Sequence, residues 1–233
     1  MVYLKVPPNL QIFLKKTREH PSVMQLVHRP HQTVKDMAES CGIPHVEIGG
    51  YYVDGKRLPD SARIPDGATV VLEASREIPD GIPRFVLDVH LTRLARYLRI
   101  LGFDCRYDKH YEDGEIADLA YSEGRIVLTR DRGLLKRAHI RWGYWVRSQT
   151  PLRQLRETAD RYNLSQWENL KSRCSHCNSI MEQRAKELVE DHLPRYTRLS
   201  YDVFYQCTGC SQLYWEGAHF PKIQELRRVV YPS

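Results

Sequence analysis

Two C-x-x-C motifs in the C-terminal third of the chain place the strongest constraint on how it can fold. Cys174 and Cys177 form the first pair, and Cys207 and Cys210 form the second. Four thiolates fill the tetrahedral shell of a structural Zn²⁺ and leave no open position for catalysis. A thioredoxin-like redox site would need one such pair at the start of a helix in a βαβ unit, which this region does not offer. We therefore expect a zinc ribbon with inserted structure between the two pairs.

Charge and hydropathy limit the cellular setting. The longest apolar runs, such as 70–72 and 126–128, are far too short for a membrane span, and no apolar segment follows the N-terminus as a signal peptide requires. These features predict a cytoplasmic protein without a membrane partner. The net charge of +6 falls within residues 81–233, because acidic and basic residues balance in residues 1–80. Such an excess suits a polyanion partner, although an ordinary solvated basic surface has the same composition.

The sequence pattern divides the chain into three domains with an overall α/β fold class. Residues 1–80 have the pattern of a β-grasp, ubiquitin-like domain, residues 81–170 alternate strands with helices, and residues 171–233 hold the zinc ribbon and the C-terminal tail. In the first domain we expect a strand at 2–6, a helix at 33–41 capped by Thr33, a hairpin turn at Asp54-Gly55 and a strand at 68–72.

The middle domain has the alternation of a doubly wound parallel sheet. Strands are expected at 85–87, 103–107, 125–129 and 142–146, and helices at about 91–101, 113–123 and 151–162. Ligands of such sheets bind beyond the C-terminal ends of the strands. Any site in this domain is therefore expected at that edge.

Three aspartates are expected at this edge. Asp88 ends the first strand, Asp131 follows the third, and Asp113 opens a connecting helix, with Glu115 as a possible additional acid. Carboxylates bind Mg²⁺ or Mn²⁺ and leave positions open for phosphate oxygens, which is a phosphodiesterase arrangement. For each aspartate alone, a helix cap or a strand end is the better explanation, whereas all three at one edge of the sheet favour a site.

Basic residues near these acids are candidates for contact with the phosphate backbone of RNA. On the first helix of the domain, however, arginines at this spacing are also what the solvated side of any amphipathic helix shows. The candidates are Arg93, Arg96, Arg99, Arg130, Arg132 and Lys136.

Several of these segments together resemble the mut-seven C-terminal RNase family. The resemblance lies in Phe85-Val-Leu-Asp88, Leu94–Arg99, Leu101-Gly-Phe-Asp104, Ile126–Leu135, and the ribbon segments Arg173–Asn178 and Tyr214–His219. It implies a PIN-like fold in which Asp88, Asp113 and Asp131 support metal-dependent RNA cleavage. Many PIN-like nucleases place a further acid two residues after the last of these aspartates, whereas this chain has Gly133.

The N-terminal domain resembles the ubiquitin-like domain, related to sulfur carriers, that often precedes this RNase domain. The likeness lies in Val34–Met37, Gly42–His45 and Val53–Gly55. Sulfur carriers end in a free Gly-Gly, but here Gly49-Gly50 is internal. We therefore expect this domain to recognise RNA or a protein partner.

The sequence thus predicts a metal-dependent ribonuclease with structural zinc and catalytic magnesium or manganese. The main alternative is a non-catalytic RNA-binding or ribosome-associated adaptor with a vestigial acidic site. A third reading is a nuclease acting on DNA.

Overall fold

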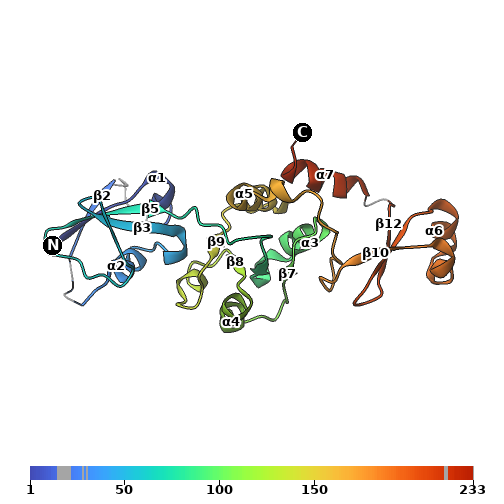
Figure 1. The fold of residues 1–233 in the computed structure, drawn as a ribbon, viewed down its shortest axis with the longest axis horizontal. Helices are drawn as coiled ribbons and strands as arrows, with labels where there is room; N and C mark the ends of the chain where they lie inside the picture. The colour runs from blue at the N-terminus through green and yellow to red at the C-terminus, as the bar shows by residue number, and fades with distance from the viewer. Residues whose placement is uncertain (15–21, 28, 30, 218–219, 233) are drawn as a thin grey trace.

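The computed structural model describes residues 1–14, 22–27, 29, 31–217 and 220–232. Ala218 and His219, the end of the last ribbon segment quoted above, lie outside the described residues. Figure 1 shows three units in a row: a sheet with one main helix at the N-terminal end, a central α/β unit, and a ribbon at the far side. The C-terminal helix returns to the central unit (Figure 1).

The N-terminal unit is a five-stranded mixed sheet of the β-grasp kind. Its order is β2-β1-β5-β3-β4, with β1 and β5 parallel at the centre. Thr33 caps the main helix: its hydroxyl accepts the Asp36 N–H at 3.1 Å, and the Asp36 carboxylate accepts the Thr33 N–H at 3.2 Å. The elements are β1 (Val2–Lys5), α1 (Pro8–Gln11), β2 (Val23–Leu26), α2 (Val34–Ser40), η1 (His45–Glu47), β3 (Ile48–Val53), β4 (Lys56–Leu58) and β5 (Thr69–Ala74).

The central unit is a four-stranded, fully parallel sheet with helices on both faces. The strand order is β7-β6-β8-β9, so the direction of winding reverses between β6 and β8. The strands are β6 (Phe85–Leu87), β7 (Cys105–Arg106), β8 (Ile126–Thr129) and β9 (Gly143–Trp145). In doubly wound sheets, the crevice beyond the strand ends at such a reversal is the usual ligand site.

Two buried clusters join the helices to this sheet, as alternation along each strand requires. Phe85 and Leu128 face α3 and α5, whereas Val86 and Val127 face α4. The helices and short turns are η2 (Val89–Leu91), α3 (Thr92–Ile100), α4 (Asp113–Glu123), η3 (Leu134–Lys136), α5 (Pro151–Tyr162) and η4 (Leu164–Trp167).

Helix α3 ends just before Gly102, the residue that the sequence predicted to stop it. The Gly102 φ of 98° is readily accessible only to glycine, and a Cβ there would lie 2.4 Å from the Cβ of Leu170. The segment that leads to the ribbon therefore crosses directly over the end of α3.

The ribbon is a three-stranded antiparallel sheet in the order β10-β11-β12. The inserted structure expected between the cysteine pairs contains three short helical segments around a small core with Phe204. Leu226 and Val230 of α7 pack in the central core, so part of the C-terminal tail belongs structurally to the central unit. The elements are β10 (Met181–Arg184), η5 (Lys186–Leu188), η6 (Glu190–His192), α6 (Arg195–Ser200), β11 (Phe204–Cys207), β12 (Leu213–Trp215) and α7 (Phe220–Val230).

Across the described part of the chain, no helix is both long and apolar enough to cross a membrane.

Candidate functional site

Two of the predicted acids lie at the winding reversal and are linked through one threonine. Asp88 directly follows β6, and Thr129 is the last residue of β8. The Thr129 hydroxyl donates to Oδ2 of Asp88 at 2.6 Å and accepts the backbone N–H of Asp131 at 2.8 Å. Asp88 is 6% exposed and Thr129 is fully buried. Thr129 therefore links the carboxylate of Asp88 to the backbone of Asp131.

Each of these carboxylates keeps one oxygen for a ligand. Oδ1 of Asp131 accepts the N–H of Gly133 at 2.7 Å, while its Oδ2, like Oδ1 of Asp88, has no hydrogen bond from a described residue. A Cβ at position 133 would lie 3.2 Å from Oδ1 of Asp131. Gly133, at the position where many PIN-like nucleases have a further acid, thus allows a tight turn that orients Asp131.

Asp113 and Glu115 lie at the start of α4 in other contacts. Asp113 is half-exposed and lies 3.8 Å from the guanidinium of Arg137. The helix cap is Glu112 instead of Asp113, and Oε2 of Glu115 accepts the Glu112 N–H at 2.8 Å. Among the described residues, only the four cysteines bring three or more His, Cys, Asp or Glu ligand atoms within 4.8 Å of one another. The side chains of Asp88, Asp113 and Asp131 do not gather that closely.

A basic pocket of about 540 Å³ opens beside the two strand-end acids. Arg93 and Arg130, both predicted to bind RNA, line it together with His90. Polar and small groups from the starts of α3 and α5 and the loop after β9 complete it: Thr92, Gln149, Pro151 and Gln154. The pocket walls contain no carboxylate, so their charge favours an anion. His90 was missed from the sequence, although its position two residues after Asp88 was a usable signal.

Arg99 was also predicted to contact RNA, but the structure places it inside the protein. Its side chain is buried at 5% exposure because the guanidinium connects the sheet to the first cysteine pair. It donates to the carbonyl of Cys105 at 2.8 Å, and to the carbonyls of Ser175 and His176 at 3.1 and 3.0 Å. By contrast, Arg93 and Arg96 on the same helix are exposed.

Arg132 and Lys136 were also predicted to contact RNA, but both point to the ubiquitin-like unit. Arg132 donates to the carbonyls of Phe13 and Ile12 at 3.0 and 3.3 Å. Lys136 donates to the carbonyl of Glu39 at 2.7 Å. These contacts turn both side chains toward the ubiquitin-like unit.

The four cysteines of the ribbon form the predicted cluster. The Sγ atoms of Cys174 and Cys210 are 3.7 Å apart, and those of Cys177 and Cys207 are 3.2 Å apart. Tetrahedral Zn²⁺ with bonds of about 2.3 Å places its sulfur ligands about 3.8 Å apart. The N–H groups of Gly209 and Cys210 point at the Cys207 sulfur at 3.3 and 3.4 Å. This donor set fits a structural zinc ion.

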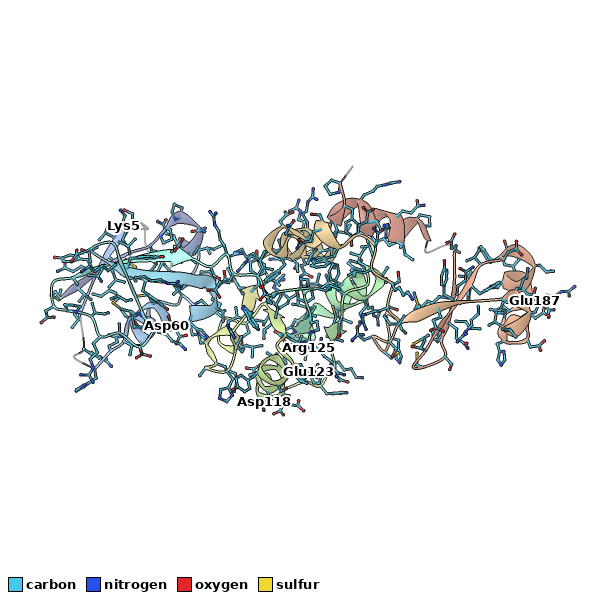
Figure 2. All side chains as sticks on the ribbon, in the orientation of Figure 1. Lys5, Asp60, Asp118, Glu123, Arg125 and Glu187 are labelled. Atoms are coloured by element: carbon cyan, nitrogen blue, oxygen red, sulfur yellow. The ribbon has the colours of Figure 1, made fainter. Side chains whose placement is uncertain are left out.

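An ionic network ties the ribbon to the opposite edge of the parallel sheet. Arg125 pairs with Asp104 at 2.9 Å and with Glu123 at 2.6 Å, and Figure 2 labels Arg125 and Glu123 beside α4. Asn178, which follows the first cysteine pair, donates to Asp104 at 2.7 Å and accepts the Cys105 N–H at 3.0 Å. The cysteine cluster and the central sheet are therefore one hydrogen-bonded structure.

Comparison with protein families matches both parts of this architecture. The description "Mut7-C RNAse domain" matches residues 83–227, and "Mut7-C ubiquitin" matches residues 1–77. No curated protein and no solved structure matches the chain.

Proposed function

Because the chain belongs to the Mut7-C RNAse domain family, we propose that it is a metal-dependent ribonuclease that hydrolyses RNA phosphodiester bonds with a PIN-like domain. The observation that carries this proposal is the pair Asp88 and Asp131, joined through Thr129 at the winding reversal beside a basic pocket. Acids and cations then lie side by side, as a polyanionic substrate and a divalent ion require.

The two strand-end acids are proposed to hold the catalytic ion. Their free oxygens, Oδ1 of Asp88 and Oδ2 of Asp131, are hard ligands of the kind that Mg²⁺ and Mn²⁺ prefer. A bound ion would supply activation of the attacking water and neutralisation of charge on the phosphate. Thr129 keeps Asp88 oriented, and the Gly133 N–H does the same for Asp131. Asp113 is proposed as a third acid that acts after release from Arg137, with Glu115 in reserve.

The pocket is proposed to hold the RNA backbone next to the acids. Arg93 and Arg130 would pair with phosphates there, with Arg96 further along α3. Such contacts position the substrate and carry no base sequence information. His90, which lines the same pocket two residues after Asp88, is proposed to contact a phosphate oxygen there.

The test is cleavage of end-labelled RNA by the full-length protein with Mn²⁺, Mg²⁺ or chelator. We expect cleavage that needs the ion and is lost in Asp88→Asn and Asp131→Asn, with RNA affinity retained. Arg93→Gln and Arg130→Gln should instead weaken binding, and each should lower the slope of log K against log salt by about 0.7 to 0.9. Asp118→Asn, on an exposed position of α4 (Figure 2), is the matched acid control.

A non-catalytic RNA-binding adaptor is the second candidate. The observation that favours it is that the side chains of Asp88, Asp113 and Asp131 do not gather within 4.8 Å of one another, while Asp113 lies 3.8 Å from Arg137. The same assay separates the two functions: wild type and Asp88→Asn that bind RNA alike and cleave nothing with either ion would establish the adaptor. Replacement of RNA by DNA of the same sequence tests the third reading.

A further inference from the structure

The ubiquitin-like unit contacts the loop that carries Asp131. This loop, residues 130–142, runs from the end of β8 to β9 and contains η3. Figure 1 shows it beneath the junction between the N-terminal unit and the central sheet. The loop is rich in basic residues, and its sequence suggested RNA contacts. Its tertiary contacts suggest a different role for part of it.

The first anchor is Arg132, the residue next to Asp131. Its guanidinium lies 4.2 Å from the ring centre of Trp145 and 5.3 Å from that of Phe13. It also donates to two carbonyls of the ubiquitin-like unit, those of Phe13 and Ile12. A stacked arginine with two donors in use is held in one geometry, and lysine cannot reproduce it.

Further anchors hold the rest of the loop from the same side. Nε2 of His45 lies 2.9 Å from the carbonyl oxygen of Ile140, and Nδ1 lies 2.7 Å from the Glu39 carboxylate. Lys136 reaches the carbonyl of the same Glu39. Val46 is buried in the cluster that contains Leu134, Leu135 and Ile140. The loop is thus fixed near its start, middle and end.

The edge strand of the central sheet is covered as well. Oε1 of Glu47 accepts the N–H of Trp145 in β9 at 2.8 Å, and its other oxygen lies 3.4 Å from Arg147. A carboxylate here replaces the neighbouring strand that β9 lacks. The ubiquitin-like unit therefore completes the central sheet where it packs on the loop.

We propose that the ubiquitin-like domain is a positioning element of the ribonuclease site, and that Arg132 is the positioning residue that transmits its hold to Asp131. This inference rests on the proposed function, because Asp131 must take part in cleavage for its position to matter. Groups that orient metal-binding carboxylates typically change activity by about 10- to 100-fold when removed. The domain thereby acts within the chain, and its described contacts with the loop need no external partner.

The test compares Arg132→Gln and Arg132→Lys with Arg141→Gln in the full-length protein. Arg141 is an exposed arginine of the same loop that stacks on Trp142, and it makes a charge-matched control. We expect both Arg132 variants to lower kcat at least tenfold with unchanged RNA affinity and salt slope, and Arg141→Gln to keep wild-type kcat. Hydrogen exchange of amides 131–140 should become faster in both Arg132 variants and stay at the wild-type rate in Arg141→Gln.

A variant in the ubiquitin-like unit tests whether the Arg132 substitutions act through the contact between the units and not only on the loop itself. His45→Ala lies in a different domain and removes no charge from the loop, yet it should also lower kcat and speed exchange at residues 131–140. Normal kcat in Arg132→Lys and His45→Ala, or a salt slope reduced in Arg132→Gln, would overturn the inference and leave the ribonuclease intact. Absence of ion-dependent cleavage by wild type would instead overturn the proposed function itself.

Discussion

The hydroxyl of Thr129 donates a hydrogen bond of 2.6 Å to Oδ2 of Asp88, although the two residues end different strands. The Thr129 hydroxyl oxygen also accepts the backbone N–H of Asp131, so one buried side chain connects the two acids. A threonine is suited to this position because its hydroxyl both donates and accepts.

Replacement of Thr129 tests this link directly. Thr129→Val keeps the shape of the side chain but loses the donor and the acceptor, so we expect turnover to fall by about 10- to 100-fold with little change in RNA affinity. Thr129→Ser retains the hydroxyl and should keep most of the activity. The measurement is single-turnover cleavage with saturating Mn²⁺. Equal rates for the Val and Ser variants would show that the hydroxyl does not orient the acids.

Arg99 and Arg96 lie on the same helix and should respond in opposite ways. Arg99→Gln leaves the carbonyls of Cys105, Ser175 and His176 with fewer donors, and we expect a loss of about 2 to 3 kcal/mol of unfolding free energy. Arg96→Gln should leave stability within about 0.5 kcal/mol, because its side chain is exposed. Urea unfolding of both variants gives the comparison. An Arg99→Gln protein as stable as wild type would contradict the role of this contact.

Zinc removal should weaken the central unit as well as the ribbon. Arg99 and Asn178 join the first cysteine pair to the sheet, so loss of the ion frees groups that the sheet depends on. We expect one zinc per chain by elemental analysis, and a lower Tm for the whole protein after chelation or in Cys207→Ser. Cys41→Ser, outside the cluster, should keep both zinc and Tm. If the chelator left the Tm of the central unit unchanged, the stability of that unit would not depend on the ribbon.

Acid should destabilise the network around Arg125. Burial opposes the charge of Asp104, but hydrogen bonds from Arg125 and Asn178 outweigh it and hold the pKa of Asp104 below its usual value. A carboxyl whose pKa is lower in the folded state than in the unfolded chain stabilises the protein when the pH is above the unfolded-state pKa of about 3.9. That contribution is lost as the pH falls from there through the folded-state pKa.

Asp104→Asn should therefore lower the unfolding free energy at neutral pH by roughly 2 kcal/mol and reduce its further loss in acid. Unfolding curves between pH 2.5 and 7 provide the measurement, with Asp118→Asn as the exposed control. Identical acid profiles for wild type and Asp104→Asn would exclude this carboxyl as a source of the pH dependence.

The sequence determined the local elements and the grouping of the four ribbon cysteines. The expected helices at 113–123 and 151–162 have those bounds in the structure, because acidic residues or a proline at the start and a left-handed residue at the end are local signals. The ends of β6 and β8 were likewise visible as short apolar runs followed by Asp88 and, two residues on, Asp131. Spacing alone was enough to group the four cysteines.

Only the tertiary structure decided what the basic residues contact. Arg96 and Arg99 look alike in the sequence, yet one faces solvent and the other is buried against carbonyls far along the chain. Arg132 likewise lies in a basic segment of the kind that contacts RNA, but its hydrogen-bond partners lie in another domain. Long side chains choose partners by proximity in space, which periodicity along one helix or loop does not encode. For the same reason, the attachment of the ubiquitin-like domain to the Asp131 loop became visible only once the domains were packed together.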